Sequence, residues 1–208
     1  MADGARETLG PGHRTDPKSM RLTLPTMLTL FRIALLPVMV LVFYGGFRGA
    51  NIAASIVFIA AALTDWLDGW IARRWGLTSA FGEFLDPVAD KLMVATTLFL
   101  LVQDNPTVPL TIMAAVIVGR EITISALREW MAEIGERARV KVAGIGKIKT
   151  IAQLVALTVL LYQKDLDGFG LFHVGEVLLG LAAGLTIWSG IIYLRAAWPV
   201  LRGAPKES

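Results

Sequence analysis

Four aspartates with helical spacing are the residues of this sequence best suited to chemistry. Asp65 and Asp68 are three residues apart, and Asp86 and Asp90 are four residues apart. Each pair would therefore lie along one face of a helix. The polar connection RRWGLTSAFGEFL joins the two pairs. We therefore expect two successive helices to present four carboxylates together.

Carboxylates gathered in this way favour a site for divalent cations. They would repel one another unless a cation cancelled their charge. The sequence has no cysteine, and its two histidines, His13 and His173, lie outside the apolar segments. Oxygen ligands alone suit Mg²⁺ or Mn²⁺ better than zinc. Two such ions side by side are typical of phosphoryl transfer, because they stabilise both the attacking and the leaving oxygen.

A simpler interpretation is that the aspartates form ion pairs at a membrane surface. Arg73, Arg74 and Lys91 are near enough in sequence to serve as partners. Such pairs would explain any one aspartate, but they do not explain four in register on two helices. Ionisable groups within membrane segments usually mark function.

The elements that carry the aspartates are typical of a membrane protein. Hydrophobic residues make up 55% of the 208 residues and charged residues only 18%. A membrane-spanning helix needs about 20 mostly apolar residues. We expect an all-α, polytopic membrane protein with six transmembrane helices, at about 24–44, 50–70, 88–102, 108–126, 148–162 and 174–194. They would form one catalytic domain, 22–198, between a flexible cytoplasmic tail at 1–21 and a second tail at 199–208.

Basic residues are distributed unevenly among the connections between these segments. Of the twenty lysines and arginines, only Arg48 and Lys164 fall on alternate connections, whereas the others lie in the tails and on the opposite side. The positive-inside rule then places both termini in the cytoplasm and gives an even number of spans. The aspartates would lie near the cytoplasmic ends of the second and third helices.

The sequence around the aspartates resembles the CDP-alcohol phosphotransferase family. It matches the family signature D-x2-D-G-x2-A-R-x8-G-x3-D-x3-D without a gap, at Asp65, Asp68, Gly69, Ala72, Arg73, Gly82, Asp86 and Asp90. The resemblance implies a six-helix membrane enzyme, usually a homodimer, that joins a CDP-linked lipid or alcohol to an acceptor hydroxyl and releases CMP. It also implies that Asp65, Asp68 and Asp86 hold metal ions, while Asp90 helps to bind the second ion and takes the acceptor's proton.

Other segments are similar to the phosphatidylglycerophosphate synthases of bacteria within this family. They read LPTMLTLFRIALLPVMVLVFY, FLDPVADKLMVA, GREITISALREWMAEIG and GKIKTIAQLVAL. This likeness implies transfer of a phosphatidyl group from CDP-diacylglycerol to glycerol 3-phosphate at a bacterial inner membrane. At one position the sequence departs from the family pattern, because Thr26 stands where asparagine is common; its hydroxyl could still cap the first helix.

Two sets of residues are candidates for binding the substrates. For CDP-diacylglycerol they are Gly69, Ala72, Arg73, Ser79, Gly82, Thr29 and Arg32. Arg32 could equally extend its charged end to the membrane surface. For the phosphate of the acceptor they are Arg120, Arg128, Lys147 and Lys149. Arg120 could instead pair internally with Glu121, and the two lysines could attract anionic lipid headgroups.

Several alternatives remain open at this point. A related enzyme could use another acceptor, such as phosphatidylglycerol in a cardiolipin synthase, inositol phosphate or serine. A cation transporter would also keep carboxylates in its helices, although usually near the middle of the bilayer between inverted repeats. Trp66, Trp70 and Trp75 flank the aspartates, and we interpret them as residues of an aromatic belt at the membrane surface.

Overall fold

The computed structural model of the protein describes residues 23–76, 79–136, 145–162 and 170–202. Within these ranges the chain forms six helices: α1 (Leu24–Phe43), α2 (Ala50–Trp75), α3 (Ala80–Asp104), α4 (Val108–Glu133), α5 (Ile145–Tyr162) and α6 (Leu171–Leu201). The six predicted helices and the all-α fold are therefore confirmed. The predicted N-terminal tail lies outside the described residues. The second tail does so from residue 203, because α6 continues beyond the predicted boundary at 198.

Four of the helices, α1, α2, α4 and α6, are long and apolar enough to cross a membrane. In α5 the apolar part, Lys149–Tyr162, is shorter. Helix α3 carries Glu83, Asp86, Asp90 and Lys91 in its first half. With Asp104 at the end of the helix, these charges leave no long uncharged stretch in α3 although it has 25 residues. Helices of this length and apolarity make the protein a multi-pass membrane protein.

Local signals explain why α2 and α3 extend beyond the predicted spans, 50–70 and 88–102. Helix α2 ends at Gly76, whose φ of +64° strongly favours glycine, and α3 begins after Ser79, whose side chain accepts a hydrogen bond from the Gly82 amide. The predicted spans followed the apolar runs, which stop where the hydrocarbon layer would end. Helix α2 continues beyond its run as far as the cap at Gly76, and α3 begins before its run, directly after the cap at Ser79.

The start of α1 corrects one expectation. The residue that caps α1 is Thr23, which accepts a hydrogen bond from the Thr26 amide, and Pro25 occupies the first turn. Thr26 lies inside the helix, where its hydroxyl is 2.9 Å from the Thr23 hydroxyl and 2.8 Å from that of Ser79. The prediction that Thr26 caps the helix is therefore wrong. Its side chain instead joins the starts of α1 and α3.

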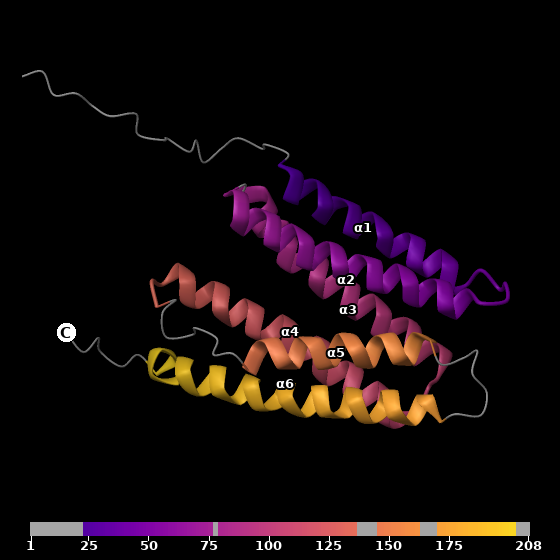
Figure 1. Cartoon of the computed structure of the whole chain (residues 1–208). Coiled ribbons are helices and arrows are strands. Elements are labelled where there is room, and N and C mark those ends of the chain that lie inside the picture. The colour runs from indigo at the N-terminus through magenta and orange to yellow at the C-terminus, as the bar shows by residue number, and fades with distance from the viewer. Residues whose placement is uncertain (1–22, 77–78, 137–144, 163–169, 203–208) are drawn as a thin grey trace, which may run out of the picture.

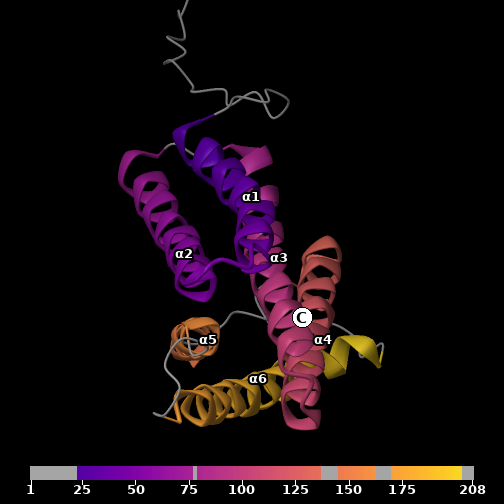
Figure 2. The same cartoon turned by 90° about the vertical axis from the view of Figure 1, so that its right-hand side faces the viewer.

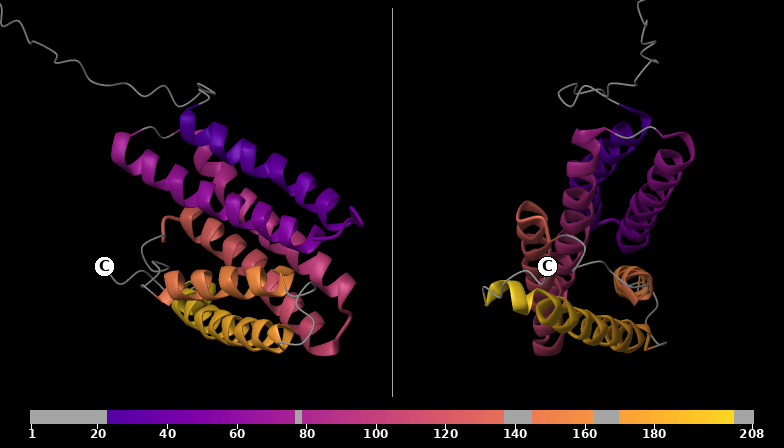
Figure 3. Two further views of the ribbon diagram at one scale, coloured as in Figure 1. Left: turned by 45° about the vertical axis from the view of Figure 1, so that its right-hand side comes forward. Right: turned by 90° about the vertical axis from the view of Figure 1, so that its left-hand side faces the viewer.

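The helices are arranged as two groups, α1–α2 and α4–α6, and α3 contacts both groups. Helices α1 and α2 lie side by side, as do α5 and α6, and the two pairs occupy opposite sides of the molecule (Figures 1 and 3). Helix α3 runs from beside α1 to a contact with α4, as Figure 2 shows. Helix α2 also contacts α5. The end of α2, the start of α3, the end of α4 and the start of α5 consequently lie at one end of the bundle (Figure 1).

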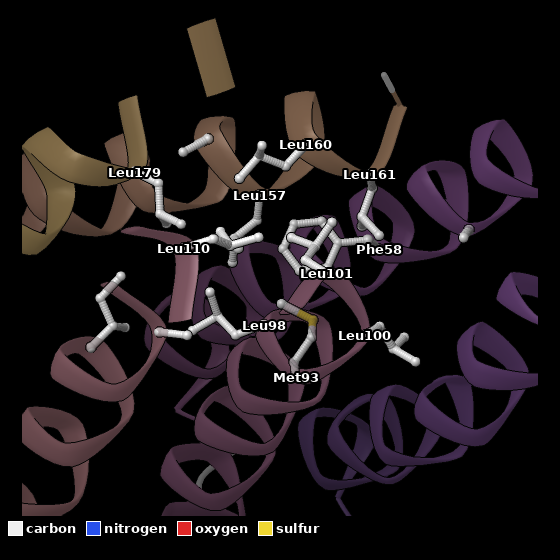
Figure 4. Close-up of a cluster of buried hydrophobic side chains, with 14 of the residues drawn as sticks. Phe58, Met93, Leu98, Leu100, Leu101, Leu110, Leu157, Leu160, Leu161 and Leu179 are labelled. Atoms are coloured by element: carbon white, nitrogen blue, oxygen red, sulfur yellow. The ribbon is translucent and has the colours of Figure 1, made fainter. Parts of the chain in front are cut away.

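An apolar core joins the two groups. Phe58 of α2, Leu98 of α3, Leu110 of α4, Leu157 of α5 and Leu179 of α6 point toward one another, as Figure 4 shows. The other core residues shown there include Met93, Leu100, Leu101, Leu160 and Leu161. Because lipid tails are as apolar as these side chains, close packing is the main source of stability here.

Close packing also explains the absence of a side chain at Gly175. A Cβ atom there would lie 2.7 Å from two side-chain carbons of Leu160. Helices α5 and α6 therefore approach each other more closely than they could with any larger residue at this position. Small residues at helix contacts have this effect in many membrane proteins.

We predict that Leu157→Ala destabilises the protein, because it leaves a cavity among packed side chains. The expected loss is about 2 kcal/mol or more in the free energy of unfolding, seen as a lower unfolding temperature in detergent. Ile151→Ala on the same helix is the matched control, since Ile151 is 63% exposed and Leu157 is 0% exposed. Equal unfolding temperatures for the two variants would contradict this account of the core.

Candidate active site

The aspartates of α2 and α3 meet around an arginine of α1. Arg32 Nη1 is 2.9 Å from Asp65 Oδ1 and 2.8 Å from Asp90 Oδ1, and Arg32 Nη2 contacts Asp68 Oδ2. The Arg32 side chain is 0% exposed and that of Asp68 is 3% exposed. The side chains of Asp65 and Asp90 are 43% and 49% exposed. Arg32 and Asp68 are therefore the buried part of the cluster, and the carboxylates of Asp65 and Asp90 are partly exposed.

The fourth aspartate, Asp86, is held by the same face of α1. Its Oδ1 accepts a hydrogen bond from the Thr29 hydroxyl, which also lies 3.1 Å from the carbonyl oxygen of Pro25. Thr29 and Arg32 are three residues apart and so share one face of α1. That single face contacts both acid pairs.

These contacts settle two interpretations made from the sequence. Within the described residues, the ion pairs of the aspartates run to Arg32 and not to Arg73, Arg74 or Lys91. The prediction that Arg32 extends its charge to the membrane surface is wrong, because its side chain is completely buried. A contact between Arg32 and a diphosphate stays a prediction.

The chemistry of the four side chains fits a divalent cation of the magnesium type. All of them are carboxylates, and oxygen donors are the ligands that such hard cations prefer. In the part of the chain that the structure describes, no three acidic or histidine side chains are already close enough together to form a cation site. The guanidinium of Arg32 lies between three of the carboxylates and accounts for their spacing. The donor set therefore fits, and Arg32 occupies the position where its members converge.

The predicted contacts for a CDP-linked lipid surround the start of α3 and the end of α2. A Cβ atom at Gly82 would lie 2.8 Å from Thr26 Oγ1 and 3.1 Å from Ser79 Oγ, so Gly82 permits the close approach of α1. At Gly69, a Cβ atom would lie 3.2 Å from a guanidinium nitrogen of Arg73. Arg73 is exposed and Ala72 is half-buried. The residues of the signature are therefore neighbours at one end of the bundle.

Two of the residues predicted to bind the acceptor's phosphate, Arg120 and Lys149, belong to a second polar cluster, which joins α4, α5 and α6. Glu121 accepts a hydrogen bond from Lys149 and lies 3.6 Å from Arg120 Nη1. Arg120 Nη2 donates to Ser189 Oγ at 2.9 Å, and its guanidinium lies over the ring of Tyr193. The internal pairing of Arg120 with Glu121 is thus present.

The other two candidates for the acceptor's phosphate differ from these. Arg128 is exposed on α4. For Lys147 the structure describes the backbone, as part of α5, but not the side chain. Sequence reasoning missed Ser189 and Tyr193, although a serine and a tyrosine four residues apart in an apolar helix are a signal of a polar helix face. The three tryptophans near the aspartates, Trp66, Trp70 and Trp75, are exposed.

Comparison with known proteins gives a family and several close relatives. Residues 22–188 match the family model described as CDP-alcohol phosphatidyltransferase. Relatives in Sodalis glossinidius and in Pectobacterium atrosepticum are each 51% identical over 178 residues, which cover 86% of this chain and 96% of the relative. A relative in Yersinia pestis is 50% identical over 179 residues, with 86% and 97% covered. All three are named CDP-diacylglycerol–glycerol-3-phosphate 3-phosphatidyltransferase.

We predict that Gly82→Ala lowers stability, because the added methyl group would separate α1 from α3. The expected loss is about 1–3 kcal/mol in the free energy of unfolding. Gly184→Ala on α6 is the control, since a Cβ atom there meets nothing within 4 Å. It should leave the unfolding temperature unchanged or raise it, as alanine favours helix over glycine. A Gly82 variant as stable as the Gly184 variant would show that the contact with Thr26 is not tight.

Proposed function

Because this chain belongs to the CDP-alcohol phosphatidyltransferase family, we propose that it transfers the phosphatidyl group of CDP-diacylglycerol to glycerol 3-phosphate and releases CMP. The product is phosphatidylglycerol phosphate, a precursor of anionic phospholipids. The observation that carries the proposal is the identity of about half the residues with relatives named for this reaction over most of both chains. The four aspartates at the junction of α2 and α3 supply chemistry that suits it.

Members of this family generally depend on a divalent metal. Here Asp65, Asp68, Asp86 and Asp90 would hold Mg²⁺ or Mn²⁺, two ions in each active site, and these would supply positive charge at the diphosphate of the lipid substrate. Gly69, Ala72, Arg73, Ser79, Gly82 and Thr29 would bind CDP-diacylglycerol. An exposed guanidinium at Arg73 is a suitable partner for a phosphate at the end of the bundle.

Asp90 is the candidate for the base. Its side chain is half exposed, so a hydroxyl group from solution could reach it. Asp90 would take the proton of the glycerol 3-phosphate hydroxyl while that oxygen forms a bond to the phosphorus that bears diacylglycerol. The bond between this phosphorus and the oxygen of CMP breaks in the same displacement. CMP then leaves with the electron pair of that bond.

Arg120, Arg128, Lys147 and Lys149 would bind the phosphate of the acceptor. In this proposal Glu121 orients Lys149 and Arg120, because it contacts both. Charged hydrogen bonds from arginine and lysine are the usual way in which proteins hold a small dianion. This assignment favours glycerol 3-phosphate over acceptors that carry no phosphate, such as serine.

We also propose a location and an assembly. The unequal distribution of basic residues supports a bacterial inner membrane protein with both termini and the active site facing the cytoplasm. One site at the cytoplasmic end of the helices could receive a lipid from the bilayer and soluble substrates from the cytosol. The family resemblance supports a homodimer.

The reaction is tested with purified protein in detergent, supplied with CDP-diacylglycerol and Mg²⁺. We expect CMP release that requires glycerol 3-phosphate and stops when a chelator is added. Release that requires phosphatidylglycerol, inositol phosphate or serine instead would keep the reaction type and overturn the acceptor. No release with any acceptor would overturn the proposal and favour cation transport, which a flux assay in vesicles would then test.

We predict that Asp90→Asn lowers the rate of CMP release by about 10²-fold or more, because an amide cannot accept the proton. Binding of CDP-diacylglycerol should change much less, as measured by equilibrium binding to the purified variant. Asp104→Asn, at the other end of α3, is the control and should retain the rate of the unaltered protein. Substantial turnover by the Asp90 variant would remove its assignment as the base.

A further inference from the structure

Arg32 is a buried cation with an unusual set of partners. It is the largest of the fully buried side chains of the described residues, and it contacts aspartates from two other helices. The contacts use Nη1 and Nη2, whereas Nε has no hydrogen-bond partner. Because a buried charge is costly unless it is paired, the aspartates are what keep Arg32 in this position.

The charges of the cluster do not balance. When all four carboxylates are ionised they carry four negative charges and Arg32 carries one positive charge, so three negative charges remain on Asp65, Asp68, Asp86 and Asp90 together. Thr29, the other contact from α1, is neutral. The cluster can therefore accept more positive charge, but any cation that enters it meets Arg32 there.

Arg32 and a divalent cation require the same atoms. Arg32 contacts Asp65 Oδ1, Asp68 Oδ2 and Asp90 Oδ1. A hard divalent cation would also bind carboxylate oxygens of these aspartates, at about 2.0–2.6 Å. An oxygen that accepts a hydrogen bond from a guanidinium is a weaker metal ligand, and the two cations repel each other.

We propose that Arg32 is a built-in counter-cation of the aspartate cluster that positions Asp65, Asp68 and Asp90 and competes with divalent cations for them. This inference rests on the proposed function, in which these aspartates bind metal. Arg32 keeps α1, α2 and α3 in register when metal dissociates, and it weakens metal binding so that the ions exchange readily. Arg32 is thus a positioning residue for the metal ligands.

Replacing Arg32 has opposite effects on metal binding if the residue competes with cations and if it is purely structural. A structural arginine would lower stability when replaced and would either weaken metal binding or leave it unchanged. A competing arginine, when replaced, lowers stability in the presence of a chelator but tightens metal binding. Arg32→Met removes the charge and keeps an unbranched side chain. Arg32→Lys keeps the charge but lacks the planar fork that contacts three carboxylates.

The experiment measures Mn²⁺ binding to the full-length protein in detergent without substrates, by the electron paramagnetic resonance signal of free Mn²⁺. We expect the Kd for Mn²⁺ to be about tenfold or more lower in Arg32→Met than in the unaltered protein. A nearby charge shifts an ionisation equilibrium by a factor of this size, and removing the charge of Arg32 should affect the binding of a cation in a similar way. Arg32→Lys should have an intermediate Kd. Binding that is detected only in Arg32→Met would support the proposal as well.

Thermal unfolding provides a second readout. In a chelator, Arg32→Met should unfold at a lower temperature than the unaltered protein, and saturating Mn²⁺ should restore most of the difference. Met39→Ala is the matched control, because Met39 is a buried residue of α1 in the apolar core. It should lower the unfolding temperature equally with and without Mn²⁺ and leave the Kd unchanged.

The outcomes separate this inference from the proposed function. A Kd for Arg32→Met equal to or above that of the unaltered protein would overturn the role of Arg32 while the metal site remained. Absence of Mn²⁺ binding in every variant would overturn this inference, whereas the proposed reaction is judged separately by the release of CMP. If Arg32→Met does not fold even in Mn²⁺, the Kd of Arg32→Lys decides, and a value equal to or above that of the unaltered protein overturns the inference.

Discussion

The contact between one buried guanidinium and three carboxylates is the constraint on which the arrangement of α1, α2 and α3 depends. In a helix bundle surrounded by lipid, a charge has no water to solvate it and must find its partner within the protein. Arg32 can reach Asp65, Asp68 and Asp90 only if one face of α1 is turned toward both other helices. The rotation of α1 about its axis is thereby fixed, and the Thr29 contact with Asp86 follows from it.

The apolar part of the bundle contributes in a different way. Side chains such as Phe58 and Leu157 would be almost as well solvated by lipid as by one another, so they favour close packing without choosing one arrangement strongly. The polar contacts make that choice, at the aspartate cluster for α1–α3 and at the Arg120–Glu121–Lys149 cluster for α4–α6. The two polar clusters therefore set the register of the two helix groups, and the core in Figure 4 fills the space between them.

The sequence predicted the helices and the aspartates well for physical reasons that are local. Apolar length identifies a membrane helix, and a spacing of three or four residues places Asp65 beside Asp68 on one face. The partner of Arg32 could not be predicted, because it depends on how α1 is rotated against two helices distant in sequence. The same limit applies to Ser189, which receives a hydrogen bond from Arg120. Helix ends were misplaced where a cap such as Ser79 lies beyond the apolar run.

The order of charges along the chain has a consequence for how the protein is made. Charged residues interrupt the apolar sequence of α3, and at the centre of a membrane helix a charged side chain costs about 2.5–3.5 kcal/mol on insertion scales. Synthesis from the N-terminus delivers Arg32 first, the acid pair of α2 next and that of α3 last. The cation thus precedes the anions along the chain, so Arg32 is available to offset part of the negative charge of each acidic helix as the bundle assembles.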